Sequence, residues 1–277
     1  MNKTLKYALS SLALIASAAS SSATVFFAEN FETYTPDAAV PTDNIWFLRT
    51  ENGSFKTKDD STNNDFSGSK YGEIIFDDTA EIDDPLVTVR SSYSVTGSAT
   101  GQVSFKFLDP STPNTTGNGF LLRLGTTAGN STTAFAIFIK DGNFIKSSTS
   151  GIAGSTFASY SLGTTNELDI VYNNSASTLN YNGGSVVSRA MDIYLNGTLV
   201  GDDIDGGTIG SSLTVGSAVE KLNFTAKTSS STFNGTLYVD DILMNDAISI
   251  PETNSITAWF GILIGLTTLA TRRVSNR

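Results

Sequence analysis

The feature that most constrains this 277-residue chain is a series of short apolar or alternating runs, separated by clusters of Gly, Asn, Asp and Ser. None of these runs has the length and 3.6-residue period of an amphipathic helix. Residues 102–108 (QVSFKFL) alternate strictly, which predicts a strand with Val103, Phe105 and Phe107 on one inward face. Nine further strands are expected, at 25–31, 72–76, 86–90, 119–124, 134–140, 167–172, 191–195, 221–226 and 236–243.

The connections between these runs indicate how the strands pair. Asp141-Gly142 and Asn196-Gly197 each stand between two runs, and such dipeptides are typical of type I′ hairpin turns. Ten or more strands at short spacing, with no linker or internal repeat, predict one antiparallel two-sheet sandwich. We therefore expect an all-β fold over residues 24–248.

Composition excludes several classes of chemistry. The chain has no His and no Cys, which rules out Ser–His–Asp catalysis, imidazole-ligated zinc or haem, disulfides and thiolate metal sites. The formal net charge is −10, and residues 24–251 hold 26 acidic against 12 basic residues, a net charge of −14. Because nucleic-acid phosphates attract basic proteins, we expect no nucleic-acid partner.

The N-terminus has the pattern of a secretory signal. Lys3 and Lys6 form a positive region, residues 7–19 are apolar and small, and a small-residue cleavage site ends at Ala23. Residues 1–23 are therefore predicted to be a helical signal peptide, which implies export.

The C-terminus, from residue 249 onward, has a second address-like pattern. Pro251 and Glu252 precede an apolar stretch at 256–270, and Arg272 and Arg273 follow it. Fifteen helical residues span about 22 Å, less than the roughly 30 Å hydrocarbon core of a bilayer. The positive-inside rule would keep the Arg pair in the cytoplasm. A plain membrane anchor and a core helix of the domain are the alternatives for this segment.

This order of motif, apolar helix and Arg pair resembles the PEP-CTERM sorting signal of Gram-negative bacteria, with Thr253 in place of the second proline. The resemblance implies that residues 249–277 are a sorting segment processed by a membrane exosortase. The protein would then reach the cell surface or extracellular matrix, held transiently or permanently in the cytoplasmic membrane by residues 256–270.

The order of motifs in the middle of the chain suggests a fold family. Residues 29–32 (ENFE) open the series, and 119–125, 136–142, 191–197 (MDIYLNG) and 237–242 (LYVDDI) follow. This order resembles the concanavalin A-like, laminin-G-like jelly roll. A galactose-binding-type jelly roll, which has similar first and last strands, is the rival fold.

Such jelly rolls often hold a structural Ca²⁺ through oxygen ligands, which suits a chain without His or Cys. Pairing of the first and last strands would bring Glu29 or Glu32 near Asp240 or Asp241, and these four residues are the candidate metal ligands. Residues 202–205 and 77–78 are other acidic candidates. The alternative is that all of these are solvated edge charges, which discourage aggregation.

A catalytic role is examined at Glu167 and Asp169. Retaining β-glucanases of the resembled fold carry a Glu-x-Asp-x-(x)-Glu strand, but here Val171 or Tyr172 stands where the acid/base carboxylate belongs. Because glycoside hydrolysis needs two carboxyl groups, we expect a solvent-facing strand and no enzyme.

Aromatic residues raise the possibility of sugar binding. Trp46 is expected in the core, whereas Tyr160, Tyr172 and Tyr181 lie near polar loops and could line one rim. We therefore expect an exported, non-enzymatic surface or matrix protein that binds or is embedded in extracellular polysaccharide. The strong negative charge favours a neutral polymer over an acidic one, unless calcium bridges them. A coat protein making protein–protein contacts is the alternative, and a degenerate glycosidase is the third reading.

Overall fold

The computed structural model describes residues 23–41, 46–50, 53–60, 65–66, 68–77, 86–91, 97–110, 119–127, 130–147, 153–206, 213–227 and 234–250. Most of the expected signal peptide, Pro251 and Glu252, the apolar stretch 256–270, and Arg272 and Arg273 lie outside these residues. Across the described ranges, no helix has the length and apolar character needed to cross a membrane.

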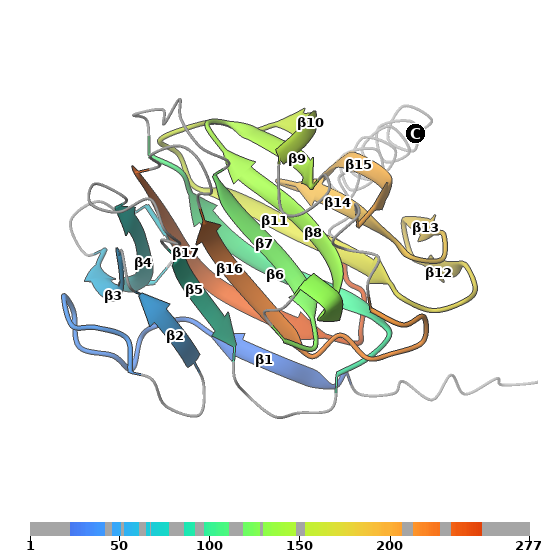
Figure 1. The fold of residues 1–277 in the computed structure, drawn as a ribbon, viewed down its shortest axis with the longest axis horizontal. Helices are drawn as coiled ribbons and strands as arrows, with labels where there is room; N and C mark the ends of the chain where they lie inside the picture. Colours follow the sequence, from blue (N-terminus) through green and yellow to red (C-terminus); the bar gives the residue numbers. More distant parts are fainter. Residues whose placement is uncertain are drawn as a thin grey trace, which may run out of the picture.

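The described chain is all-β and its sheets are antiparallel, as the sequence predicts (Figure 1). One sheet has eight strands in the order β15-β14-β11-β6-β17-β4-β3, with β1 paired to β17 as well. Its strands are β1 (Val25–Glu29), β3 (Gly53–Asp59), β4 (Lys70–Asp77), β6 (Thr100–Leu108), β11 (Asn166–Asn173), β14 (Ala190–Leu195), β15 (Thr198–Asp205) and β17 (Asn234–Asn245).

The second sheet has seven strands in the order β10-β9-β8-β7-β16-β5-β2, and in Figure 1 it lies over the first. Its strands are β2 (Trp46–Thr50), β5 (Leu86–Ser91), β7 (Phe120–Gly125), β8 (Thr133–Lys140), β9 (Asn143–Ser147), β10 (Ala153–Ser159) and β16 (Lys221–Lys227). A short hairpin of β12 (Leu179–Tyr181) and β13 (Gly184–Val186) and a 3-10 turn η1 (Asn130–Thr132) complete the described elements.

The core lies between the two sheets because alternate residues of each strand face inward. On β6, Val103, Phe105 and Phe107 expose at most 1% of their surface, which confirms the period-two prediction. Phe105 meets Phe224 of β16 edge to face at 5.5 Å between ring centroids, a contact that joins the two sheets.

Both predicted hairpin turns are present. Asp141 and Gly142 have φ of 48° and 76°, and Asn196 and Gly197 have φ of 50° and 74°. Two successive positive φ angles define the type I′ turn, and its twist matches that of the flanking strands.

The two ends of the sandwich lie together, which confirms the expected pairing of the first and last strands. Ala28 pairs with Leu243 and Glu29 with Ile242 in antiparallel register. Beyond the strands, the Thr24 amide donates to the Asp246 carboxylate at 2.7 Å, and the Asp246 amide donates back to the Thr24 carbonyl at 3.2 Å.

Candidate functional site

A β-bulge in β17 creates the most unusual acidic site of the described chain. Opposite β6, the register shifts between Asp240 and Leu243, and Asp241 adopts a left-handed conformation with φ of 48°. A bulge adds one residue without changing the face of the strand that follows. Val239 and Ile242 therefore both remain in the core, and the two acids between them turn away from it.

Asp240 is a fully buried carboxyl group without hydrogen-bond partners. Its exposure is 0%, and neither carboxylate oxygen has a partner with hydrogen-bond geometry. Burial raises the pKa of Asp240 to about 7; the nearby Asp241 amide and the Lys106 ammonium oppose the rise, and the charges of Asp241 and Glu32 add to it. A native protein rarely keeps such a group without a functional or ligand-binding reason.

Glu32 brings a second carboxylate to the same place from the turn that follows β1. It accepts hydrogen bonds from the Ser69 hydroxyl at 2.5 Å, the Ser69 amide at 2.6 Å and the Lys70 amide at 3.0 Å. The Ser69 hydroxyl bond is the main reason that the pKa of Glu32 is lowered. Glu32 is thus held ionised and in a fixed position.

Gly68 leaves space between these two carboxylates. A Cβ added to Gly68 would lie within 3.6 Å of an oxygen of both Glu32 and Asp240. The absent side chain therefore creates a cradle lined by one ionised carboxylate and one unpartnered carboxyl group. Hard cations such as Ca²⁺ prefer oxygen ligands of this kind, so the residues present fit the calcium ion that the fold resemblance implies.

The other two candidate ligands have different partners. Glu29 accepts bonds from the Phe31 amide at 2.7 Å, the Tyr34 hydroxyl at 2.9 Å and the Trp46 indole N–H at 3.3 Å. Asp241 forms an ion pair with Lys106 at 2.8 Å. The structure therefore brings together Glu32 and Asp240, and it turns Glu29 and Asp241 towards other groups.

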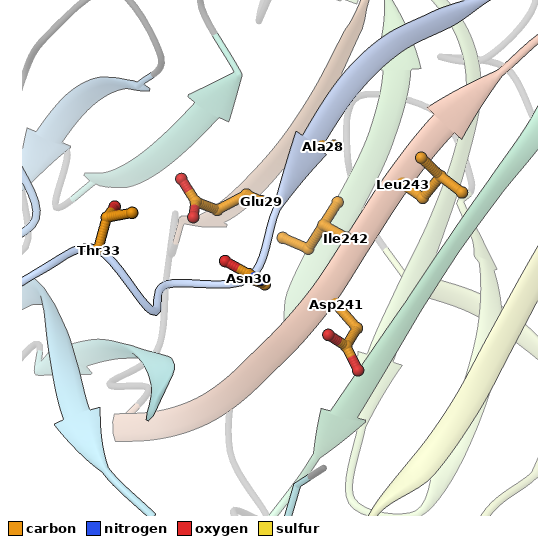
Figure 2. Close-up of a pocket in the computed structure, with 7 residues that line it drawn as sticks. All are labelled: Ala28, Glu29, Asn30, Thr33, Asp241, Ile242 and Leu243. Atoms are coloured by element: carbon orange, nitrogen blue, oxygen red, sulfur yellow. The ribbon is translucent and has the colours of Figure 1, made fainter. Parts of the chain in front are cut away.

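An open pocket of about 460 Å³ lies along the seam between β1 and β17 (Figure 2). In Figure 2 the carboxylates of Glu29 and Asp241 point in different directions, so they do not converge on one ion. The pocket is lined by Ala28, Glu29, Asn30, Thr33, Asp241, Ile242 and Leu243.

A second acidic group involves a residue that the sequence analysis did not select. Asp192, Asp202 and Asp203 each place one carboxylate oxygen within 4.8 Å of the others, so they could hold a metal ion. Asp192 is buried and already accepts bonds from the Tyr181 hydroxyl at 2.6 Å and the Asp203 amide at 2.8 Å. Of the candidate segment 202–205, the structure therefore draws the first two residues into this group. Of the pair 77–78, Asp77 ends β4 and Asp78 lies outside the described residues.

The aromatic side chains considered for sugar binding are mostly buried. Tyr172 is fully buried, and Tyr160 is 8% exposed with its hydroxyl donating to Asp109 at 2.5 Å. Tyr181 donates to Asp192. Trp46 is 1% exposed and lies in the core, as expected. The expected tyrosine rim is therefore not formed, because each ring packs inward or bonds a buried carboxylate.

The Glu167–Asp169 strand places its two acids in different surroundings. Glu167 is exposed, whereas Asp169 is 3% exposed and accepts bonds from the Ser104 hydroxyl at 2.5 Å and the Gln102 amide at 2.8 Å. Val171 and Tyr172 are both fully buried. This strand offers no second accessible carboxylate for acid/base catalysis.

The burial of Asp240 makes stability depend on pH in a defined direction. Its folded pKa of about 7 exceeds the ordinary Asp value, so the unfolded chain ionises first as the pH rises. In a calcium chelator we therefore expect Asp240→Asn to unfold at the wild-type temperature near about pH 4 and above it near about pH 7.5. Thermal unfolding across this range measures the difference. A constant difference would contradict the buried ionisable group.

No family model and no curated protein matches the chain. Among solved structures, the chain is similar to a GH131 β-glucanase catalytic domain from Podospora anserina, with a TM-score of 0.50 and 11% identity over 82% of this chain and 98% of that one. It is also similar to domain 4 of the GH43 arabinanase AbnA from Geobacillus stearothermophilus, with a TM-score of 0.44 and 15% identity over 81% and 93%. An alginate lyase of polysaccharide lyase family 7 gives a TM-score of 0.39 and 12% identity over 74% and 95%.

These comparisons correct one expectation drawn from the sequence. The solved structures of this fold are mostly glycoside hydrolases and polysaccharide lyases, and the β-glucanase match is to a catalytic domain. The expectation that the chain is not an enzyme, which rested on a missing carboxylate in one strand, is therefore contradicted. The chain shares the antiparallel sandwich of a polysaccharide-degrading catalytic domain.

Proposed function

We propose that this protein is an exported, concanavalin A-like jelly roll that interacts with extracellular polysaccharide and is stabilised by calcium. The sandwich that it shares with a β-glucanase catalytic domain supports polysaccharide as the ligand class. The net charge of −14 between residues 24 and 251 favours a neutral polymer.

The single observation that carries the calcium part is the buried carboxyl group of Asp240, which has no partner and lies across the Gly68 cradle from Glu32. Glu32 and Asp240 would hold the ion. Bound there, calcium would supply the positive charge that lets Asp240 ionise without water. It would also tie the turn after β1 to the bulge of β17.

The address signals complete the proposal. Residues 1–23 would direct export, and Pro251 and Glu252 with Arg272 and Arg273 would be recognised by an exosortase-type enzyme of a Gram-negative bacterium. Residues 256–270 would hold the chain in the cytoplasmic membrane, transiently or permanently. The sandwich would then act at the cell surface or in the extracellular matrix.

Binding to defined polysaccharides tests the function. The purified full chain in mild detergent is titrated with neutral and uronate-containing polymers, with calcium and with a chelator. We expect saturable binding to a neutral polymer that weakens when calcium is removed. The same samples are assayed for new reducing ends, and their release would make the protein a hydrolase of its ligand. Absence of binding to every polymer, including that of the producing cell, would overturn the proposal.

A further inference from the structure

The outer face of the seven-stranded sheet carries a row of polar side chains that no described feature explains. On β16, Leu222, Phe224 and Ala226 face the core. Asn223 and Thr225 alternate with them and therefore face the opposite side of the sheet. Even so, Asn223 is 1% exposed and Thr225 is 5% exposed.

These two side chains are unpartnered as well as buried. Both polar atoms of the Asn223 amide, Nδ2 and Oδ1, lack hydrogen-bond partners, and so does the Thr225 hydroxyl. Each such group loses its bonds to water and gains nothing from the protein in return. Three unpartnered atoms on alternate residues of one strand indicate that the partner is something other than this chain.

The strand register shows what surrounds them. Asn223 is opposite Arg123 of β7, and Thr225 is opposite Leu121. Leu121 in turn is opposite Phe138 of β8, and these two residues form a buried apolar cluster separate from the main core. A polar row, which includes a guanidinium with a pKa lowered by burial, thus runs beside an apolar row that contains an aromatic ring.

We propose that Asn223 and Thr225 form a subsite that binds the hydroxyl groups of a neutral sugar unit, which rests on the function proposed above. An amide presents one donor and one acceptor side by side, the pattern that two adjacent hydroxyls of a sugar ring complement. The Thr225 hydroxyl adds a third bond, and the apolar row faces the C–H surface of the ring. Because both residues are nearly inaccessible, binding requires local opening, and its association rate is expected below about 10⁵ M⁻¹s⁻¹.

Apolar replacements of similar shape separate a ligand subsite from a structural role. Thr225→Val and Asn223→Leu remove the unpartnered atoms and keep most of the volume. We expect both variants to unfold about 2–4 °C above the wild type, because an unsatisfied buried group is lost. We expect polysaccharide affinity to fall about tenfold in Thr225→Val and further in Asn223→Leu.

Thr57 on β3 provides the matched control. Its side chain is fully buried and its hydroxyl is also unpartnered, but it lies on the other sheet. Thr57→Val should therefore raise the unfolding temperature similarly and leave binding unchanged.

The outcomes distinguish this inference from the function on which it rests. If the wild-type full chain binds no polysaccharide, the proposed function is wrong and the subsite with it. If the wild type binds and Thr225→Val and Asn223→Leu bind equally well, the subsite alone is wrong. A fall in unfolding temperature for Thr225→Val would show that the hydroxyl is satisfied by ordered water, and would also overturn it.

Discussion

Calcium should raise the unfolding temperature of the wild-type chain by about 5–10 °C when it is present at about 100 times its dissociation constant. The reason is that Ca²⁺ binds the folded cradle of Glu32, Gly68 and Asp240, whereas the unfolded chain does not assemble it. Asp240→Asn should abolish this shift, because the amide cannot supply the negative charge that the ion requires. Differential scanning calorimetry with calcium and with chelator measures both effects.

Two further variants make this test specific. Gly68→Ala should also remove the calcium shift, because its Cβ would enter the space between the carboxylates. Asp202→Asn, in the other acidic group, should retain it. A calcium shift that survives in Asp240→Asn and is lost in Asp202→Asn would place the ion at Asp192, Asp202 and Asp203 instead.

Trp46→Ala should destabilise the domain by about 3–5 kcal/mol, which corresponds to a fall of about 6–20 °C in unfolding temperature. The indole lies edge to face with Phe27 and Phe55, both at 5.2 Å, and stacks on Phe31 at 6.1 Å. Its N–H also donates to the carboxylate of Glu29. Truncation would leave a cavity among these rings and remove one partner of a buried acid.

Trp46→Phe is the graded comparison, since it keeps most of the ring contacts and loses the N–H. Its loss should be smaller than that of Trp46→Ala, as measured by thermal unfolding followed by circular dichroism. If Trp46→Ala unfolded at the wild-type temperature but lost polysaccharide binding, the indole would be a ligand contact and its place in the core would be refuted.

The fold was accessible from sequence wherever one strand face is apolar. All ten expected strands are present, because runs such as 102–108 alternate and must bury one face. The missed strands lack that signal. β10 is exposed along much of its length, and β15 buries only Gly201 and Ile204, so their pairing depends on neighbours far along the chain.

The site was accessible only in outline. Pairing of the two terminal strands follows from their similar patterns, but the bulge at Asp240 is a one-residue change of register that periodicity does not reveal. Which of Glu29 and Glu32 meets Asp240 depends on Phe31, whose φ of 57° reverses the chain between them. The unpartnered Asn223 was invisible for a different reason: an absent hydrogen bond leaves no mark in the sequence.

The adjacency of the two ends of the sandwich determines how it would respond to mechanical load. Tension applied between Thr24 and Asp246 would separate β1 from β17 starting at the Val25–Asn245 pair and moving towards Glu29 and Ile242. In this geometry hydrogen bonds break one after another, as in a zipper, rather than sharing the force as they do in shear. The Glu32–Asp240 cradle lies at the far end of this path, so a bound ion would act as the catch at which peeling stops.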